Sequence, residues 1–297
     1  MTAAIDLAPV STSRQTGPAV LMILGSCASL QFGAALAAHL FPVTGAIGAT
    51  VLRLGLAACL LLAITRPAVR GWTRQQWGVL VLFGICLAGM NGFFYAAISR
   101  IPLGIAVTIE LLGPLVLTAV LSRRARDLVW VLLAACGVVA LGWAGDGSAA
   151  AGLDPLGVVF VLIAAVFWAL YILTGSRAGA AVPGQGGLAV AITVATVLVL
   201  PFGAHGAGPA LVQPHLLLIA LGTSVLASVI PYTLEMAALR RLPRRVFGVL
   251  LSLEPAMAAL AGWLLLSQEI GPVGAAAIAL VVLASVGSTL SSRSQVG

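Results

Sequence analysis

Long apolar runs alternate with short polar connections along almost the whole of the 297-residue chain. Each run has about 17 to 24 residues, the length at which an α-helix crosses the hydrocarbon core of a bilayer. The runs are continuous and lack the alternation of barrel strands, so they predict helices. The ten predicted spans are 18–38, 43–65, 76–98, 102–121, 128–144, 155–173, 187–204, 215–238, 245–266 and 271–290.

The composition places this chain in the membrane. It is 61% hydrophobic and 8% charged, with a mean hydropathy of +1.15, whereas soluble domains carry about 25% charged residues. A water-facing globule is therefore excluded, and the ten spans leave little chain for a soluble catalytic domain. We expect an all-α integral membrane protein with ten transmembrane helices.

All fifteen basic residues are arginine, and the net charge is +7. Such a charge fits either nucleic-acid binding or cytoplasmic loops that follow the positive-inside rule. With the N-terminus in the cytoplasm, thirteen arginines lie on the inner side and only Arg100 on the outer side, while Arg53 lies within a span. This asymmetry favours a membrane protein that binds no nucleic acid, with cytoplasmic tails at 1–17 and 291–297.

The first span also resembles a signal peptide, because residues 35–37 read as a small-residue cleavage site. A signal peptide has an apolar region of only about 7–15 residues. The run that starts at Pro18 is longer, so we expect a retained transmembrane helix.

The cysteines and histidines form no metal-binding pattern. Cys27, Cys59, Cys86 and Cys136 all fall within apolar runs and form no CxxC pair, so we expect small buried hydrophobic residues rather than disulfides or metal ligands. The three histidines fall at outer span ends, and no HExxH, GxSxG or Ser-His-Asp pattern is convincing. We therefore expect neither an enzyme nor a bound cofactor or metal.

Prolines mark an internal repeat. Three pairs share an offset of 141 residues: Pro42 and Pro183, Pro102 and Pro243, Pro114 and Pro255. Each half holds five spans, and an odd number places the two halves in opposite orientations. We predict two inverted five-helix repeats, over 18–144 and 155–290, an arrangement typical of alternating-access transporters.

Three ionisable residues lie at mid-span. Arg53, Glu110 and Glu254 each carry an insertion cost of roughly 2.5–3.5 kcal/mol, which makes them candidates for a functional site. The repeat offset maps Gly113 onto Glu254, and Glu110 lies one helical turn before Gly113. Each carboxylate also precedes a proline that breaks helical hydrogen bonding and frees carbonyls to line a cavity. The alternative is a structural pair in which Arg53 neutralises one glutamate.

Further polar residues are weaker candidates. Asn91 and Tyr232 are repeat equivalents, and Tyr95 and Glu235 lie one turn further along their helices. They are suited to a gate or to substrate contacts, or to holding helices together. Glu235 also lies within reach of Arg240 or Arg241, which favours a surface pair.

Two aromatic residues complete the candidate set. Trp168 and Tyr171 share a helix face, too deep at Trp168 for an interfacial belt, and fit either packing or a cavity wall. Gln31 and His39 on the first span remain ambiguous.

With these features, the chain resembles the EamA-type branch of the drug/metabolite transporter superfamily, in particular the bacterial threonine/homoserine exporter family. The resemblance covers about residues 18–290. It rests on PLGIAV at 102–107 leading to Glu110 and Gly113-Pro114, WALYIL at 168–173, glycines from 175 to 179, PY-LEM at 231–236, and the stretch 241–256 that ends in SLEPA.

The resemblance implies an efflux carrier of the bacterial inner membrane for small amino acids such as threonine and homoserine, driven by proton antiport with alternating access. In this hypothesis Arg53 receives the substrate carboxylate, directly or through a glutamate. Glu110 and Glu254 neutralise the amino group or exchange a proton. The runner-up is efflux of another metabolite or a drug, and an integral-membrane enzyme or receptor is the rival of a different class. The residues themselves leave the exact substrate, the proton stoichiometry and the oligomeric state open.

Overall fold

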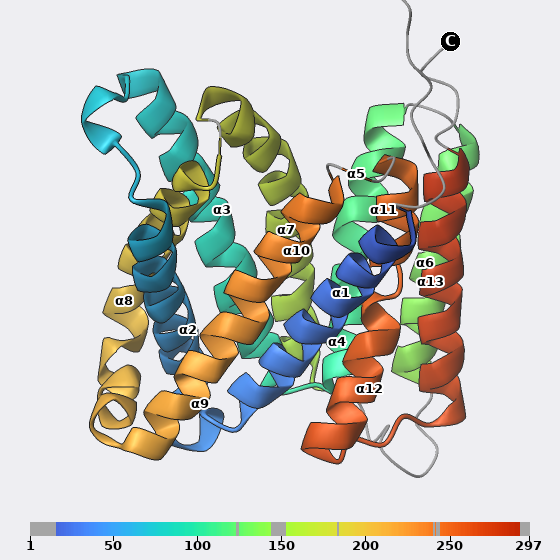
Figure 1. Ribbon diagram of the computed structural model, residues 1–297. Coiled ribbons are helices and arrows are strands. Elements are labelled where there is room, and N and C mark those ends of the chain that lie inside the picture. The colour runs from blue at the N-terminus through green and yellow to red at the C-terminus, as the bar shows by residue number, and fades with distance from the viewer. Residues whose placement is uncertain are drawn as a thin grey trace, which may run out of the picture.

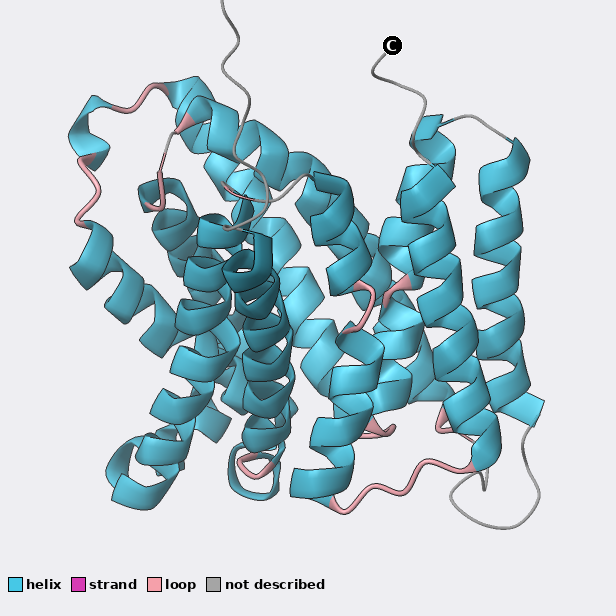
Figure 2. Ribbon diagram, turned by 45° about the vertical axis from the view of Figure 1, so that its right-hand side comes forward, coloured by secondary structure: helices cyan, strands magenta, loops and turns pink. Residues whose placement is uncertain are grey.

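The computed structural model describes residues 16–122, 125–143, 153–182, 184–239, 241 and 244–291. Within these residues the chain is helical and contains no strand (Figure 2). Nine helices there are long and apolar enough to cross a membrane, and Asp127–Ala140 is a shorter apolar helix. The expected all-α, multi-pass membrane protein is confirmed. Most of the two predicted tails lies outside the described residues.

The helices follow the predicted spans closely (Figure 1). Their bounds are α1 (Thr16–Ala38), α2 (Phe41–Thr65), η1 (Val69–Gly71), α3 (Arg74–Ile98), α4 (Leu103–Glu110), α5 (Leu112–Ser122), α6 (Ala125–Trp143), α7 (Pro155–Ala181), α8 (Gly186–Val212), α9 (Pro214–Ser224), the π-helix η2 (Val225–Val229), α10 (Ile230–Leu239), α11 (Arg244–Leu251), α12 (Glu254–Leu266) and α13 (Pro272–Ser291).

Local sequence explains where several helices begin. Thr73 caps α3 by accepting a hydrogen bond from the Gln76 N–H, while the Gln76 side chain accepts one from the Thr73 N–H, as in a capping box. Asp154 caps α7 by accepting from the Leu156 N–H at 2.9 Å. Proline at the first helical turn, as in α9, costs nothing because the N–H groups there have no intrahelical partner.

Two helices extend well beyond their predicted ends. The spans predicted to end at 173 and 204 continue to Ala181 in α7 and to Val212 in α8. Arg177 therefore lies within α7 rather than in a connection. Helix α8 continues through Pro201 and Pro209, since membrane helices tolerate prolines when neighbouring groups satisfy the freed backbone.

Two spans break where the prolines predict. The fourth span divides at Leu111, between α4 and α5, and Pro114 lies in the first turn of α5. The ninth span divides at Ser252 and Leu253, and Pro255 lies in the first turn of α12. The prediction of broken helices beside Glu110 and Glu254 is confirmed.

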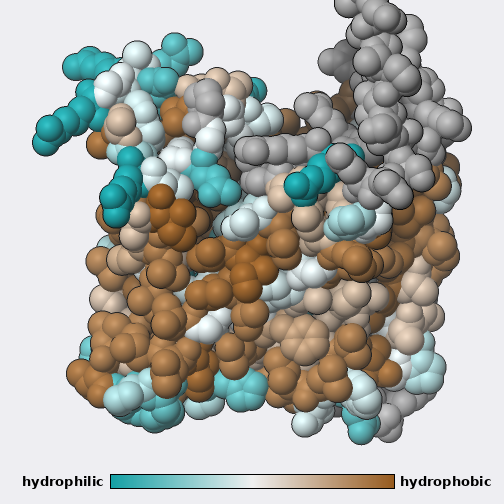
Figure 3. All heavy atoms as spheres, viewed as in Figure 1, coloured by the Kyte–Doolittle hydropathy of each residue, from teal (hydrophilic) through white to brown (hydrophobic). Residues whose placement is uncertain are grey.

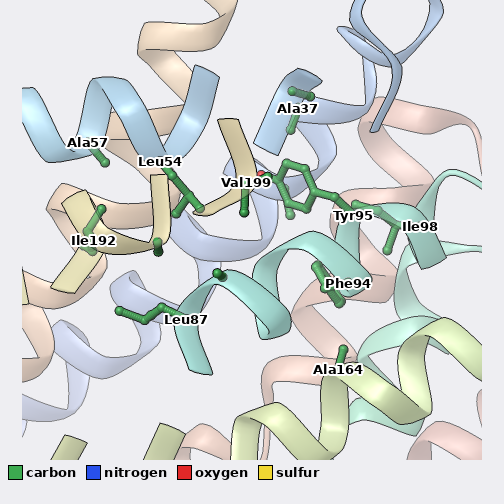
Figure 4. Close-up of a cluster of buried hydrophobic side chains, with 14 of the residues drawn as sticks. Ala37, Leu54, Ala57, Leu87, Phe94, Tyr95, Ile98, Ala164, Ile192 and Val199 are labelled. Atoms are coloured by element: carbon green, nitrogen blue, oxygen red, sulfur yellow. The ribbon is translucent and has the colours of Figure 1, made fainter. Parts of the chain in front are cut away.

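Small residues let the helices pack closely. Helix α2 lies along α8, and α3 lies along α7. A Cβ atom added at Gly203 of α8 would lie 2.6 Å from the Ile47 carbonyl oxygen of α2, so this crossing requires glycine. Leu54, Leu87 and Ile192 bring α2, α3 and α8 together in the core (Figure 4).

The outer surface is apolar where it would meet lipid. Figure 3 shows a hydrophobic band with hydrophilic residues gathered toward its two ends. Phe202 is 82% exposed on this surface. Cys27 and Cys86 are buried as predicted, but Cys59 and Cys136 are exposed, so the expectation that all four are buried is wrong for these two. In a membrane an apolar run does not distinguish a core-facing cysteine from a lipid-facing one, because both environments are apolar.

The helix connections divide between two ends. The connection from α2 to α3 and the N-terminal turn of α11 lie at the upper end in Figure 1. The turns from α8 to α9 and from α12 to α13 lie at the lower end. At the lower side of α3, Arg100 donates to Asp154 at 2.7 Å. This hydrogen bond from the guanidinium holds the pKa of the Asp154 carboxyl below its usual range, with help from the Leu156 N–H.

Gly113 of α5 lies directly against the backbone carbonyl of Ala165 in α7. We expect Gly113→Ala to lower the free energy of unfolding by about 1–3 kcal/mol, because the added methyl group forces two packed helices apart. Gly78→Ala is the matched control, since nothing lies within 4 Å of an added Cβ there. Thermal unfolding in detergent compares the two variants, and equal melting temperatures would contradict the close approach of α5 and α7.

Candidate functional site

A cavity of about 600 Å³ lies between the helices, a volume typical of small-molecule sites. Eight of the nine candidate residues from the sequence line it. They are Arg53, Asn91, Glu110, Trp168, Tyr171, Tyr232, Glu235 and Glu254. The cavity therefore brings together residues that are up to about 200 positions apart in the chain.

Both mid-membrane glutamates lie at helix breaks. Glu110 is the last residue of α4, and Glu254 is the first residue of α12. Their exposed fractions are 8% and 6%. The break beside each proline leaves backbone groups without helical partners, and both glutamates line the cavity. Near Glu254, the Ser252 and Ser285 hydroxyls lie 2.6 Å apart.

Arg53 binds backbone rather than a carboxylate. Its Nη2 donates to the Ala227 carbonyl at 2.8 Å, and Ser224 Oγ donates to the Arg53 carbonyl at 3.1 Å. Arg53 is 6% exposed, and among the described residues its Nε has no hydrogen-bond partner. Among the described ion pairs, none joins Arg53 to Glu110 or Glu254. The guanidinium thus keeps a donor for a further partner.

The Arg53 contact lies at a π-helical segment. In η2 the Ile230 N–H bonds to the Val225 carbonyl, five residues earlier, and Pro231 follows without an N–H. Carbonyls in this segment consequently lose intrahelical partners. Two side chains from the first half replace them: Arg53 donates to the Ala227 carbonyl, and Ser29 Oγ donates to the Leu226 carbonyl at 2.7 Å.

Tyr95 lies behind Arg53 instead of in the cavity wall. Tyr95 is fully buried and is absent from the cavity lining. Its ring centroid lies 5.3 Å from the Arg53 guanidinium carbon, a cation–π distance, and its ring contacts Phe41 edge-on at 5.8 Å. Tyr95 therefore positions the guanidinium, and the structure does not bring its side chain to the cavity surface.

Glu235 has a different partner from the one that its spacing indicates. Its carboxylate accepts a hydrogen bond from Ser26 Oγ of α1 at 2.7 Å. Arg241 instead points its Nη1 at the Met22 sulfur, 3.2 Å away, while Arg240 lies outside the described residues. Helix α1 packs against α10 and supplies the serine, so the carboxylate contributes to the cavity instead of to a surface pair.

Aromatic rings form one wall of the cavity. Tyr171 stacks on Phe83 with ring centroids 5.2 Å apart, and Trp168 and Tyr232 also line the space. Asn91 donates its Nδ2 to the Leu87 carbonyl of its own helix at 2.8 Å. The cavity lining therefore combines an aromatic wall with the polar side chains of Arg53 and the carboxylates.

The sequence left Gln31 undecided, and the structure places it in the cavity wall. It is 3% exposed, and its Oε1 has no hydrogen-bond partner among the described residues. A single amide inside an apolar span was the available signal. His39 differs, because its Nδ1 contacts the Ala35 carbonyl at 3.2 Å near the end of α1. The Ala227 carbonyl had no signal in the sequence, since it is a backbone group.

Comparisons with known proteins identify relatives along nearly the whole chain. The model of the EamA-like transporter family matches residues 155–290. The threonine/homoserine exporter RhtA of Escherichia coli (strain K12) is 40% identical over 276 residues, which cover 93% of this chain and 92% of that protein. The exporter of the same name from Salmonella typhimurium (strain SL1344) is 41% identical over 274 residues, 92% of each chain.

One solved crystal structure has the same fold. It aligns with 93% of this chain and 98% of its own, with a TM-score of 0.61 and 21% sequence identity. At this identity the likeness concerns the arrangement of the helices and not the substrate.

A double-mutant cycle tests the contact between Arg53 and the Ala227 carbonyl, which Pro231 leaves without a helical donor. We expect Arg53→Gln to lower the free energy of unfolding by about 1–3 kcal/mol, because the Ala227 carbonyl loses its donor in an apolar setting. In a Pro231→Ala background the loss is smaller, since the alanine N–H reaches the same carbonyl four residues back. Thermal unfolding of the double-mutant cycle measures this difference.

Pro201→Ala is the control for that cycle, because Pro201 lies within α8 and frees a carbonyl elsewhere. It leaves the effect of Arg53→Gln unchanged. Additive losses in the Pro231→Ala cycle would contradict the assignment of Arg53 to the Ala227 carbonyl.

Proposed function

The chain belongs to the EamA-like transporter family, and we propose that it exports small amino acids such as threonine and homoserine in exchange for protons. The named relatives are transporters and not enzymes, and so is this chain. The observation that carries the substrate proposal is the 40% identity to a threonine/homoserine exporter over 93% of the chain. The cavity supports it, because Arg53, Glu110 and Glu254 place groups of opposite charge in one lining.

The cavity chemistry suits a zwitterion. Arg53 lines the cavity, its Nε has no hydrogen-bond partner among the described residues, and in our proposal its guanidinium binds the substrate carboxylate. Glu110 and Glu254 lie across the helix breaks and receive the ammonium group, because charge-assisted hydrogen bonds are the strong ones in an apolar site. Asn91, Glu235 and the aromatic residues Trp168, Tyr171 and Tyr232 shape the remaining wall, and Tyr95 holds Arg53 in place.

Proton exchange follows from the same carboxylates. A buried carboxylate that loses its ammonium partner is costly to keep ionised. When the substrate leaves, a proton therefore replaces the ammonium group on Glu110 or Glu254, and the next substrate displaces it. The coupling needs no cofactor, only the substrate, protons and the bilayer.

Alternating access rests on the predicted inverted repeats. Helices α4 and α11 both have eight residues and begin 141 positions apart, at Leu103 and Arg244. Helix α3 and the α9–η2–α10 segment are related by nearly the same offset. The family match at 155–290 coincides with the proposed second repeat. These correspondences support two five-helix units, 18–144 and 155–290, that move against each other around the cavity.

The arginine distribution supports the orientation that we propose. The connection from α2 to α3, which carries Arg66 and Arg70, lies at the upper end in Figure 1. The turn from α3 to α4 carries Arg100 alone. By the positive-inside rule the upper end faces the cytoplasm, with both termini there, in a bacterial inner membrane.

The second candidate function is efflux of a bulkier metabolite or drug. One observation favours it: the volume of about 600 Å³ and the aromatic wall leave more apolar space than threonine occupies. Transport assays with both classes of substrate distinguish the two functions.

Everted membrane vesicles with an acidic interior test the substrate. We expect radiolabelled threonine and homoserine to accumulate inside, and collapse of the pH gradient to abolish the accumulation. Valine and a cationic dye serve as the competing substrate classes. Accumulation of the dye without either hydroxylated amino acid would contradict amino-acid export and favour the second function.

Neutralising a carboxylate tests the coupling. We expect Glu110→Gln to exchange threonine across the membrane but to lose accumulation driven by the pH gradient, because the proton carrier is gone. Glu269→Gln is the matched control, since Glu269 is exposed in the α12–α13 connection. An unchanged pH dependence in counterflow with Glu110→Gln would remove Glu110 from the coupling role.

Substitution of the arginine tests carboxylate binding. We expect Arg53→Gln to raise the apparent KM for threonine by about tenfold or more, the effect of losing a charge-assisted hydrogen bond. Arg70→Gln, an exposed arginine in η1, leaves the KM unchanged. An intact KM in Arg53→Gln would show that Arg53 only supports the π-helical segment.

A further inference from the structure

Asp127 is a buried acid that the proposed transport site does not use. It lies in the first turn of α6 and is 1% exposed. Neither of its carboxylate oxygens has a hydrogen-bond partner among the described residues, so it does not cap its own helix. Among the described residues this buried carboxylate thus has no hydrogen-bond partner, and burial of an unpaired carboxylate is costly.

The repeat offset of 141 residues maps Asp127 onto Gln268, and Gln268 has a partner. Its Oε1 accepts a hydrogen bond from the Leu103 N–H at 2.9 Å. Leu103 is the first residue of α4, so the amide caps the beginning of that helix. The counterpart of Leu103 at the same offset is Arg244, the first residue of α11. The lower-end contact joins Gln268 to the first residue of α4. The counterparts of these two groups, Asp127 and the first residue of α11, lie at the upper end.

Helices α6 and α11 both pack against the last turns of α13. Trp130, one turn after Asp127 in α6, packs against Gly287 of α13. Gly248 of α11 packs against Thr289 of α13. The same part of α13 therefore contacts the helix that carries Asp127 and the helix that begins at Arg244.

Equivalent helices are in contact at the lower end of the molecule and are separated by the cavity at the upper end. At the lower end, an added Cβ at Gly104 of α4 would lie 2.8 Å from Ala259 Cα of α12, so these helices are in contact. The counterpart of Ala259 is Thr118 of α5, which lines the cavity instead. Phe247 and Gly248 of α11 also line the cavity. The cavity therefore separates α5 from α11 where their counterparts touch.

We propose that Asp127 is a gate residue that caps the N-terminal turn of α11 when the upper, cytoplasmic end closes. The Gln268 contact with Leu103 is its lower-end equivalent, and the two contacts form alternately. The first N–H groups of a helix lack intrahelical partners, and a carboxylate there also meets the positive end of the helix dipole. This inference rests on the inverted repeats and alternating access of the proposed function, but not on the substrate.

Cysteine accessibility without substrate tests the gate. Thr118→Cys reports opening of the upper end, and its counterpart Ala259→Cys reports opening of the lower end. A hydrophilic maleimide is applied from the cytoplasmic side for the first reporter and from the outer side for the second. The protein without a reporter gives the background from its native cysteines.

We expect Asp127→Leu to raise labelling at Thr118→Cys and lower it at Ala259→Cys, because the closed state of the upper end loses a hydrogen bond. Gln268→Leu shifts both rates in the opposite direction. Each change is about three- to tenfold, the effect of one hydrogen bond lost in one of two states. Asp127→Asn keeps an acceptor of the same length and restores the labelling ratio toward that of the native residue.

Labelling shifts in the same direction for Asp127→Leu and Gln268→Leu, or no shift with Asp127→Leu, would overturn the gate. Failure of Asp127→Asn to restore the ratio would also overturn it, and this variant remains informative if Asp127→Leu does not fold. Reciprocal shifts together with a negative amino-acid panel would refute the proposed substrate and leave the gate standing.

Discussion

Every backbone polar group inside a bilayer must find its partner within the protein, because hydrocarbon offers none. This chain places prolines and a π-helical segment in the middle of its spans and so releases carbonyls where water is absent. Arg53 and Ser29 from the first half donate to two of these carbonyls in the second half. The contacts between the halves therefore satisfy backbone groups that irregular helices expose.

The same requirement positions the residues of the proposed transport site. A helix that breaks beside Glu110 or Glu254 needs polar neighbours, and those neighbours form a polar region in an otherwise apolar core. Arg53 belongs to both systems, since its Nη2 donates to the Ala227 carbonyl, its Nε has no partner among the described residues, and its side chain lines the cavity. Binding of a substrate carboxylate to Arg53 would thus act directly on the segment that joins the two halves.

Sequence reasoning located the helix breaks and eight of the residues that line the cavity, for identifiable reasons. Prolines in apolar spans predict helix interruptions, and buried charges are costly enough to indicate function. The sequence alone therefore identified Glu110 and Glu254 as candidates. The environments of Glu235 and Tyr95 were harder to predict, because their partners Ser26 and Arg53 lie on helices that are distant in the chain. The lipid-facing positions of Cys59 and Cys136 were not predictable, since apolarity marks both the core and the lipid surface.

The amino-acid sequence by itself determined that the chain spans a membrane as helices, where those helices break and which few charges lie within them. These properties depend on apolarity and backbone chemistry, which are read along the chain one segment at a time. Only the tertiary structure decided which group each freed carbonyl, buried acid or amide meets. Arg53 and Ala227 are 174 residues apart, and Gln268 and Leu103 are 165 apart. A hydrogen bond requires contact within about 3 Å, and only the packing of the helices brings such distant residues together.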